Sequence, residues 1–579
     1  MSTFSDLLLV WGAIASTLVR RDTQPCTTVF DDSWQLLVTT EPSPYLTYLA
    51  KDGCRLWLVG ELAGYQQART NKESLQLFLD EWLAGTAQPA ALNGHFLLFL
   101  WHGRYRQWHI WTDRLGTLHA YYGHHGRQAA IGTFCPAVAQ AVASRQLDWY
   151  GLAGFFSWGF FPQDRTHYEV VRLLRPATCY VFDENGQLCQ EKRYWQWAHE
   201  PDKGRSYEDT VAEFAAIFEE VLAGQTADGR IALPISGGLD SRSIVAAVTG
   251  NGRSLANFWA YSYGYTAGSI ETRIGKQVAQ ARGLPSHSYT IQPYLFANLE
   301  RVMACVEGFQ DVTQCRQAAI TGSLRQHAEV VLTGHWGDVW LDTMGLPEQG
   351  PVDRLESVMH KLEKVGRKWL LDNFGLHGQV AHLREQVAAD LEQYSHLDDL
   401  DFRVKAFKTD QWSWRWTTAS LRVFQMAVWP RLPFYDNRLV DFFGTVPSHF
   451  LAGRRLQIDY LKRFAPDLAR ITWQPYRTNL YHSQHFHTWL VPARLLRMAW
   501  RWLSRQPVIE RNWEVQFLQG NGRQQLYDLL VTPGRPVHEF VSPATIQSLL
   551  DAFYQQPEGK SGYTVSMLLT FSAWLEQYG

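Results

Sequence analysis

The stretch Ile231-Ala-Leu-Pro-Ile-Ser-Gly-Gly-Leu-Asp-Ser-Arg242 carries the strongest local pattern in the chain. A short apolar run leads into two glycines, and a second apolar segment, SIVAAV, begins at Ser243. Glycine lets the backbone turn tightly and approach a ligand without a Cβ in the way. The pattern therefore predicts a strand, a tight loop and a helix that begins near Asp240.

The predicted loop suits a phosphate group. The amides of Gly237 and Gly238, the hydroxyls of Ser236 and Ser241 and the helix N-terminus would form a concave set of donors. Asp240 cannot hold phosphate by charge, so its expected role is to bind a divalent cation that does. No lysine follows the glycines, which excludes the GxxxxGK[ST] loop of kinase-like NTPases. For the Ser-Gly-Gly tripeptide alone, an ordinary strand-to-helix turn is the alternative.

Upstream of this loop the chain is rich in predicted strands up to about residue 195. Buried strands are predicted at Arg55–Val59, Phe96–Trp101, Trp108–Trp111 and Cys179–Phe182. Residues Thr70–Leu83 place apolar side chains on one face of a helix. The polar segment His199–Arg205, which contains Pro and Gly, predicts a linker.

After the linker, the pattern changes to alternating helices and strands. Ser206 with Asp209 resembles a helix-capping box, and Gly224 is the expected end of the helix that follows. From there to about residue 345, strands, glycine turns and helices alternate, which is typical of a parallel α/β sheet. Residues 350–579 are predicted to be mostly helical.

Composition narrows the class of protein. The 579 residues include 54 Lys+Arg and 56 Asp+Glu, and 46% are hydrophobic, so the chain is core-rich and has no basic excess. A nucleic-acid binder held by phosphate contacts is therefore not expected.

Seven scattered cysteines without a CxxC pair favour a reducing compartment. The apolar segment Leu7–Ala15 is too short to span a bilayer and has the wrong flanking charges for a secretory signal, so we expect no transmembrane segment and a cytoplasmic protein.

The SGGLDS string resembles the pyrophosphate-binding loop of the ATP pyrophosphatases, and its surroundings resemble the asparagine synthetase and β-lactam synthetase group. Four further stretches follow the order of that family's motifs. They are LNGHF at 92–96 with DRLG at 113–116 and Tyr121-Tyr122; TGHWGD at 333–338; RLPFYD at 431–436 with Leu439–Asp441 and Val446-Pro447; and YLKRFAPDLARI at 460–471.

The resemblance implies a two-domain α/β architecture. Residues 1–198 would form an Ntn-hydrolase-like αββα domain of the type 2 glutamine amidotransferase kind. Residues 206–579 would form a parallel-sheet ATP-pyrophosphatase (synthetase) domain with a helical C-terminal part. The resemblance leaves a homodimer open.

The resemblance also implies an activity, namely ATP-dependent activation of a carboxylate as an acyl-adenylate followed by amide formation with an amine. ATP and Mg2+ would be required, and the substrate would be a small-molecule or peptide carboxylate with an amine acceptor. The Ser236–Ser241 loop would hold pyrophosphate, and Asp240 and Asp338 would bind magnesium. The remaining expected contacts to the nucleotide are Leu233, Ser262 and Gly334.

The sequence departs from the family at the start of the chain. Members that hydrolyse glutamine begin Met-Cys-Gly-Ile and use the cysteine as an N-terminal nucleophile. This chain begins Met1-Ser2-Thr3, and the best alignment places Trp11 at the nucleophile's position. The first domain is therefore predicted to be an inactive scaffold, as in β-lactam synthetases and lasso-peptide cyclases, which use an amine already in the substrate.

Two departures concern the synthetase site. Val339 stands where many synthetases have Glu, and residues 471–491 contain no lysine where the family places a catalytic one. Arg477 is the cation present there, with a different geometry, while Lys408 and Lys462 do not match the position.

His335 would face the bound intermediate and could act as the base for the amine, or it merely lines the pocket.

Several alternatives stay open. The chain could be a genuine asparagine synthase that uses ammonia or glutamine, or a non-catalytic nucleotide-binding scaffold. His482, His485 and His487 are interpreted as a polar loop in preference to a metal site. The stripe Arg494, Arg497, Arg501 and Arg505 is interpreted as a solvated helix face, with a membrane surface or an acidic partner as the alternative.

Overall fold

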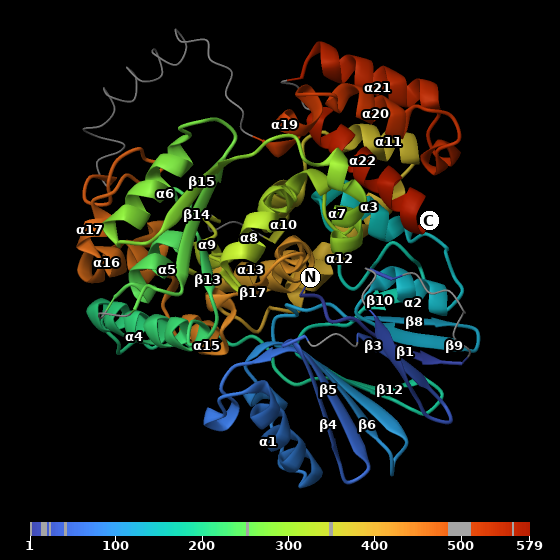
Figure 1. The fold of residues 1–579 in the computed structure, drawn as a ribbon, viewed down its shortest axis with the longest axis horizontal. Helices are drawn as coiled ribbons and strands as arrows, with labels where there is room; N and C mark the ends of the chain where they lie inside the picture. Colours follow the sequence, from blue (N-terminus) through green and yellow to red (C-terminus); the bar gives the residue numbers. More distant parts are fainter. Residues whose placement is uncertain are drawn as a thin grey trace.

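The computed structural model describes residues 3–12, 20–21, 25–39, 43–250, 254–346, 351–483, 511–557 and 561–579, with the backbone alone at 351–354. It contains three sheets, two antiparallel in the N-terminal part and one parallel in the C-terminal part (Figure 1). None of the described helices is both long and apolar enough to cross a membrane.

The two antiparallel sheets contain six strands each. The first has the order β10-β8-β9-β1-β3-β2 and the second β12-β11-β7-β6-β5-β4. Their strands are β1 (Leu7–Trp11), β2 (Cys26–Phe30), β3 (Gln35–Thr39), β4 (Leu46–Lys51), β5 (Cys54–Leu62), β6 (Gly94–His102), β7 (Gln107–Thr112), β8 (Tyr121–His125), β9 (Gln128–Gly132), β10 (Val171–Leu173), β11 (Thr178–Phe182) and β12 (Leu188–Arg193). The four strands predicted from sequence are β5, β6, β7 and β11.

The two antiparallel sheets stack face to face between helices. One core fills the space between the sheets and contains Trp11, Trp34 and Phe99. A second core joins the outer face of the second sheet to α1 (Asn71–Leu83), the helix predicted at Thr70–Leu83. Helix α2 (Cys135–Ala141) packs against β8 and β9 of the first sheet. The layers follow the order αββα, which confirms the predicted N-terminal architecture.

The parallel sheet has five strands in the order β15-β14-β13-β16-β17. They are β13 (Ile231–Pro234), β14 (Phe258–Gly264), β15 (Ser286–Thr290), β16 (Val330–Leu332) and β17 (Trp429–Arg431). The chain leaves β13 toward β14 on one side and returns to β16 on the other. In such a sheet, the carboxyl ends of β13 and β16 border the crevice where ligands usually bind.

The other helices cover this sheet and build the C-terminal region. Figure 1 shows the sheet between α5 and α6 on one side and α8 on the other. The bounds are α3 (Trp149–Trp158), α4 (Tyr207–Gln225), α5 (Asp240–Val248), α6 (Ile270–Ala281), α7 (Leu299–Val306), α8 (Thr321–His327), α9 (Gly337–Trp340), α10 (Pro351–Leu362), α11 (Arg367–Phe374), α12 (His377–Glu392), α13 (Leu400–Lys408), the π-helix η6 (Thr409–Thr417), α14 (Thr418–Gln425), α15 (Asn437–Gly444), α16 (Arg455–Phe464), α17 (Pro466–Ala469), α19 (Asn512–Leu518), α20 (Gly522–Leu530), α21 (Pro543–Gln555) and α22 (Ser561–Tyr578).

Residues 350–579 are mostly helical where the structure describes them, as predicted, and strand β17 is an exception. It pairs with β16 through Trp429, Pro430 and Arg431 and forms one edge of the parallel sheet. Proline lacks the N–H that a central strand would donate, so an edge is where a sheet tolerates it. The predicted cap of α4 is confirmed, because the Ser206 hydroxyl accepts a hydrogen bond from the Asp209 amide at 3.1 Å.

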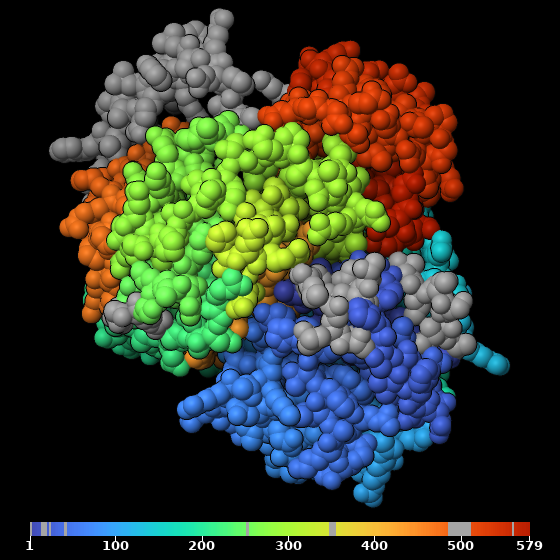
Figure 2. All heavy atoms as spheres, in the orientation of Figure 1, coloured from blue at the N-terminus to red at the C-terminus, as the bar shows by residue number. Residues whose placement is uncertain are grey.

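The N-terminal and C-terminal parts are packed together. A single buried cluster contains Leu8, Tyr121 and Phe155 from the first part and Ile231 and Val331 from the parallel sheet. In Figure 2 the N-terminal part, in blue, lies directly against the central part of the chain, in green and yellow. The two antiparallel sheets and the parallel sheet therefore form one continuous body.

Candidate active site

The loop Ser236–Ser241 joins β13 to α5 at the carboxyl end of the parallel sheet. The Ser241 hydroxyl accepts a hydrogen bond from the Ser236 amide at 3.1 Å, and the Ser236 hydroxyl accepts one from the Gly238 amide at 3.2 Å. The two hydroxyl oxygens lie 3.2 Å apart. These bonds fold the loop into the tight turn that the two glycines predict, with Ser236 exposed and Asp240 at the start of α5.

The loop after β16 lies directly against Asp240. A Cβ on Gly334 would lie 3.0 Å from the Asp240 Cβ, and one on Gly337 would lie 2.7 Å from the Asp240 Oδ1. Trp336 adopts a left-handed backbone conformation, with φ of 71°, just before the short helix α9. A side chain at Gly337 would displace the Asp240 carboxylate or the Phe434 ring, and one at Gly334 would fit only tightly. Gly337 is a residue at this site that the predicted set omitted.

The carboxylate of Asp240 is bound by two residues at the start of α16. Arg454 forms an ion pair with Oδ1, and the Gln457 side-chain amide donates to the same oxygen at 3.1 Å. Burial raises the pKa of Asp240, and the neighbouring Asp338 carboxylate raises it further, while Arg454 opposes the rise. No sequence pattern indicated Arg454 or Gln457.

His335 and Asp338 lie on the same loop with different surroundings. Asp338 is exposed, whereas the Nδ1 atom of His335 is buried and has no hydrogen-bond partner among the described residues. Burial lowers the pKa of His335 to about 4, with Asp338 acting in the opposite direction and Arg316 in the same one. The imidazole is therefore neutral at physiological pH, and the same burial also makes it a weaker proton acceptor than a histidine of near-neutral pKa.

The segment after α17 covers the phosphate loop. The amide of Gln474 donates to the Gly237 carbonyl at 3.2 Å, and a Cβ on Gly237 would collide with the Gln474 side chain. Arg477, the expected replacement for the missing lysine, is exposed in the same turn, with φ of 50°. The buried Arg242 side chain donates to the carbonyls of Leu468, Ile471 and Thr472 at 2.7–3.2 Å and so fixes the start of this segment.

The other predicted nucleotide contacts lie at the same end of the sheet. Leu233 is buried in β13, beside β14 and β16. Ser262 is buried in β14, and its hydroxyl lies 3.1 Å from that of Ser288 in β15. A Cβ on Gly275 of α6 would lie 2.8 Å from the Ser262 Cβ, so the helix packs directly over this serine. Their contact with a nucleotide stays a prediction.

Lys408 is a cation near this loop that the sequence comparison set aside. Its ammonium group lies 5.2 Å from the centre of the Trp336 ring and 5.2 Å from that of Trp412. Burial lowers the pKa of Lys408, and the attraction of Asp338 opposes the change. Lys408, at the end of α13, and Asp338, on the loop after β16, thus interact electrostatically. The two residues are too far apart in the sequence for their spacing to predict this.

The donors present suit a magnesium ion. Mg2+ is usually held by one or two carboxylates and substrate phosphates, with water completing its shell. Asp240 and Asp338 provide two carboxylates that influence each other, beside a loop built for phosphate. Among the described residues, no cluster of three or more His, Cys, Asp or Glu side chains is placed to hold a metal by itself. The arrangement fits a cation that arrives with its nucleotide.

Comparison with known families agrees with this geometry. A family model described as asparagine synthase matches residues 213–576, which is more than half of the chain. The chain belongs to the asparagine synthase family. A model described as a glutamine amidotransferase domain matches residues 63–195. The family match covers the phosphate loop, the Asp338 loop and the helices that follow them.

Solved structures and curated proteins give weaker comparisons. The allosteric regulatory enzyme of purine biosynthesis is 10% identical, with a TM-score of 0.22, over 50% of this chain and 75% of that one. The glutamine phosphoribosylpyrophosphate amidotransferase from B. subtilis is 11% identical, with a TM-score of 0.19, over 44% of this chain and 51% of that one. No curated protein matches the chain.

The position expected for a glutaminase nucleophile is filled by the Trp11 side chain. Trp11 ends β1, is 2% exposed and lies in the core between the two antiparallel sheets. Its ring centre is 5.8 Å from that of Phe182. Glu61, near the end of β5, forms a two-point ion pair with Arg431 at 2.7 and 3.0 Å. Trp11 is therefore part of the core, and Glu61 joins the N-terminal part to β17.

We predict that the purified protein does not hydrolyse glutamine. An indole packed in a core has neither the thiol nor the free α-amine that this chemistry needs. Incubation with glutamine, with and without ATP, should release no glutamate above a control without protein. Steady glutamate release would contradict the assignment.

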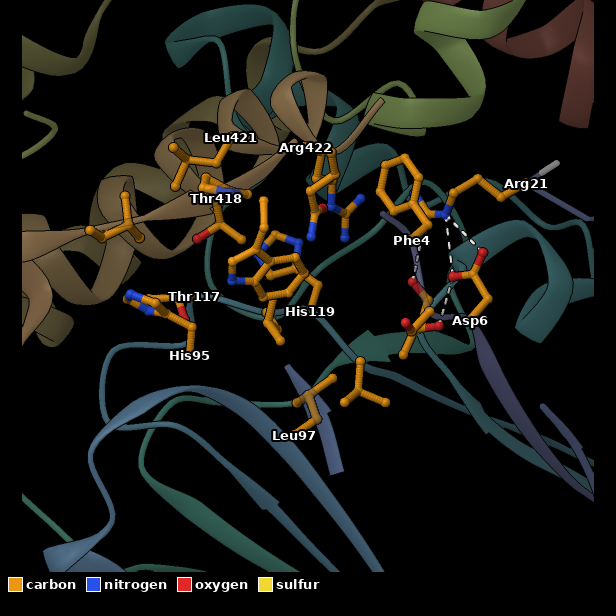
Figure 3. A pocket seen from close by; sticks show the side chains of 18 residues that line it. Phe4, Asp6, Arg21, His95, Leu97, Thr117, His119, Thr418, Leu421 and Arg422 are labelled. Atoms are coloured by element: carbon orange, nitrogen blue, oxygen red, sulfur yellow. Dashed lines mark hydrogen bonds and ion pairs between the residues drawn. The ribbon is translucent and has the colours of Figure 1, made fainter. Parts of the chain in front are cut away.

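A small cavity lies where the N-terminal and C-terminal parts meet (Figure 3). Its walls include Asp6, His95 and His119 from the first part and Thr418 and Arg422 from α14. Its volume is about 50 Å3, enough for one or two waters. The cavity contains none of the predicted site residues.

Two predictions fall wholly or partly outside the described residues. His482 is described, whereas His485, His487 and the arginine stripe at 494, 497, 501 and 505 are not.

Proposed function

We propose that the protein is an ATP-dependent amide-forming ligase that activates a carboxylate as an acyl-adenylate. The observation that carries the proposal is the convergence of two loops at the centre of the parallel sheet. The Ser236–Ser241 loop and the loop that bears His335 and Asp338 meet closely at Gly334 and Gly337. The amidotransferase-type and synthetase domains would span residues 1–198 and 206–579.

In the first step, a substrate carboxylate oxygen attacks the α-phosphorus of ATP. The bond from that phosphorus to the bridging oxygen breaks, and pyrophosphate leaves with the bonding electrons. The Ser236 and Ser241 hydroxyls and the start of α5 would hold the departing phosphates through hydrogen bonds. Asp240 and Asp338 would hold a Mg2+ ion, which supplies positive charge against the polyphosphate.

In the second step, an amine nitrogen attacks the acyl carbon, and the bond to AMP breaks. The nitrogen loses a proton as the amide forms, and the neutral His335 imidazole would accept it. The packed Trp11 supports an amine that comes with the substrate or from solution instead of from glutamine. The seven scattered cysteines, which include no CxxC pair, support a cytoplasmic, reducing location.

Pyrophosphate exchange tests the proposal directly. Labelled pyrophosphate should enter ATP only when a suitable carboxylate and Mg2+ are both present, because exchange reports reversible adenylation. A panel of mono-, di- and amino-carboxylates and short peptides covers the substrate classes. ATP binding without exchange across the whole panel would favour the alternative of a non-catalytic nucleotide-binding scaffold. Exchange with aspartate and an asparagine product would favour a genuine asparagine synthase.

A further inference from the structure

The carboxylate of Asp240 has a positively charged partner from within the chain. Arg454 forms an ion pair with its Oδ1 atom, and the Gln457 side-chain amide donates to the same oxygen at 3.1 Å. Only 14% of the Arg454 side chain and 21% of the Asp240 side chain are exposed. Water therefore screens this ion pair less than it screens a pair on the surface. The charge that a metal ion would balance at Asp240 is thus balanced by an arginine.

The backbone at Arg454 adopts a conformation that is uncommon for a residue with a side chain. Its φ is 61°, in the left-handed region, and Gly453 before it has a φ of 65°. The Gly453 amide donates to the Asp342 carboxylate at 2.9 Å, and the Arg454 amide donates to the Leu451 carbonyl at 3.0 Å. Strained backbone of this kind persists where the surrounding contacts over-determine it, often at functional sites. These contacts hold Arg454 at the start of α16, against Asp240.

Asp338 has no such partner. Its side chain is exposed, and within the ranges that the structure describes it forms no ion pair and no hydrogen bond. The negative charge of Asp338 raises the pKa of Asp240, and the positive charge of Arg454 opposes this rise. Of the two carboxylates at the candidate magnesium site, one is therefore occupied by a cation and the other is open.

Gln457 fixes one oxygen of the Asp240 carboxylate. The Gln457 side chain is fully buried, and its amide donates to the Asp240 Oδ1 atom and to the Ser243 hydroxyl, each at 3.1 Å. The second oxygen, Oδ2, forms no hydrogen bond with any residue that the structure describes. A metal ion could approach Oδ2, but only against the repulsion of the guanidinium charge on the same carboxylate.

We propose that Arg454 is an internal counter-ion that keeps free Mg2+ from Asp240 until a nucleotide arrives. This inference rests on the proposed function and adds a regulatory contact to the same site. Without nucleotide, a free divalent cation would have to displace the guanidinium or bind beside it. The phosphates of ATP bring the negative charge that allows both cations to be present. Magnesium and nucleotide should therefore bind together, each raising the affinity for the other.

Binding of Mn2+ in the absence of nucleotide tests the contact. Mn2+ replaces Mg2+ as the probe, because electron paramagnetic resonance reports its free concentration. Arg454→Met removes the charge and keeps a long side chain, so it should bind Mn2+ at least about tenfold more tightly than the wild type does. Added ATP should raise the Mn2+ affinity of the wild type by a larger factor than that of the variant. Equal Mn2+ affinity of the two proteins without nucleotide would overturn the inference.

Arg455→Met is the matched control. Arg455 follows Arg454 in the chain, but its guanidinium lies over the Tyr207 ring at 3.9 Å, and its carboxylate partner is Asp459, at 3.8 Å. This variant should bind Mn2+ as the wild type does. The double variant Asp240→Asn/Arg454→Met should lose the gain in affinity, because the gain is expected at the Asp240 carboxylate. A gain that survives in the double variant would assign the extra Mn2+ to another site and would also overturn the inference.

Arg454→Asn provides a second neutral variant. Asparagine adopts the left-handed backbone conformation more readily than most residues, so it suits the φ of this position. It should gain Mn2+ affinity as the methionine variant does. Thermal unfolding of each variant checks that the fold is retained.

The metal titration separates this inference from the proposed function. It needs neither a carboxylate substrate nor adenylation, so it gives a result even where no acid supports pyrophosphate exchange. A gain with Arg454→Met in a protein that shows no exchange would support the counter-ion and refute the ligase. Exchange in a wild type whose Mn2+ affinity is the same as that of Arg454→Met would support the ligase and refute the counter-ion. Failure of every variant to bind Mn2+, with or without ATP, would overturn both.

Discussion

Replacing Asp338 by asparagine is expected to reduce ATP–pyrophosphate exchange at least about 100-fold, because losing such electrostatic stabilisation commonly costs ~3 kcal/mol or more. The substitution keeps the size of the side chain and removes one negative charge from the site that would hold magnesium. Asp338 is exposed, so its replacement leaves no buried group unpaired. The measurement is exchange at saturating Mg2+ with the best acid of the panel.

Asp240→Asn should cause a similar loss, for two reasons instead of one. It removes a carboxylate from the same site, and it leaves Arg454 without its ion-pair partner. Asp338→Asn is therefore the cleaner variant. Asp398→Asn, a change at an exposed position outside the site, is the control and should retain wild-type exchange. Near-normal exchange in both site variants would refute the metal assignment.

His335→Ala is expected to leave pyrophosphate exchange nearly unchanged and to lower amide formation at least about 100-fold, the usual span for a lost general base. Adenylation uses the phosphate loop and the carboxylates, none of which forms a hydrogen bond with His335 among the described residues. Amide formation requires a proton acceptor, and burial keeps this imidazole neutral. Both activities are measured on the same preparation, exchange by labelled ATP and amide by product mass.

His335→Gln separates a base from a group that only lines the pocket. Glutamine retains a polar side chain but cannot take up the proton, so it should resemble alanine in both assays. Equal loss of exchange and amide formation would assign His335 to nucleotide binding. Full activity in both variants would show that another group accepts the proton.

The sequence predicted the fold through patterns that local interactions dictate. The two glycines between an apolar strand and an apolar helix give the turn of the Ser236–Ser241 loop in the structure. Alternation of short strands predicted the antiparallel sheets, and the Ser206 cap predicted the start of α4 within one residue. These features depend on neighbours in sequence, which is why one chain suffices to find them.

Residues brought together by long-range packing could not be found in this way. Arg454 and Gln457 reach Asp240 from more than 200 positions away, and nothing in their own segment distinguishes them from surface residues. Lys408 lies outside the segment where the family places its lysine, yet the fold places its ammonium group over the ring of Trp336, two positions before Asp338. Strand β17 could not be predicted from its own residues, because Pro430 is compatible with a strand only at a sheet edge, and the edge is set by the fold.

The buried cluster shared by the N-terminal and C-terminal parts has a consequence for how such a protein can change over time. A nucleophile is one side chain, and a tryptophan can take its place without loss of the surrounding layers. The layers themselves are different, because Tyr121 stacks on Phe309 with ring centres 5.6 Å apart, and Tyr45 stacks on Trp429 of β17 at 4.1 Å. Removing the first part would uncover an edge of the parallel sheet and leave Arg431 without Glu61. The first part can therefore serve as structural support for the parallel sheet, independently of any chemistry of its own.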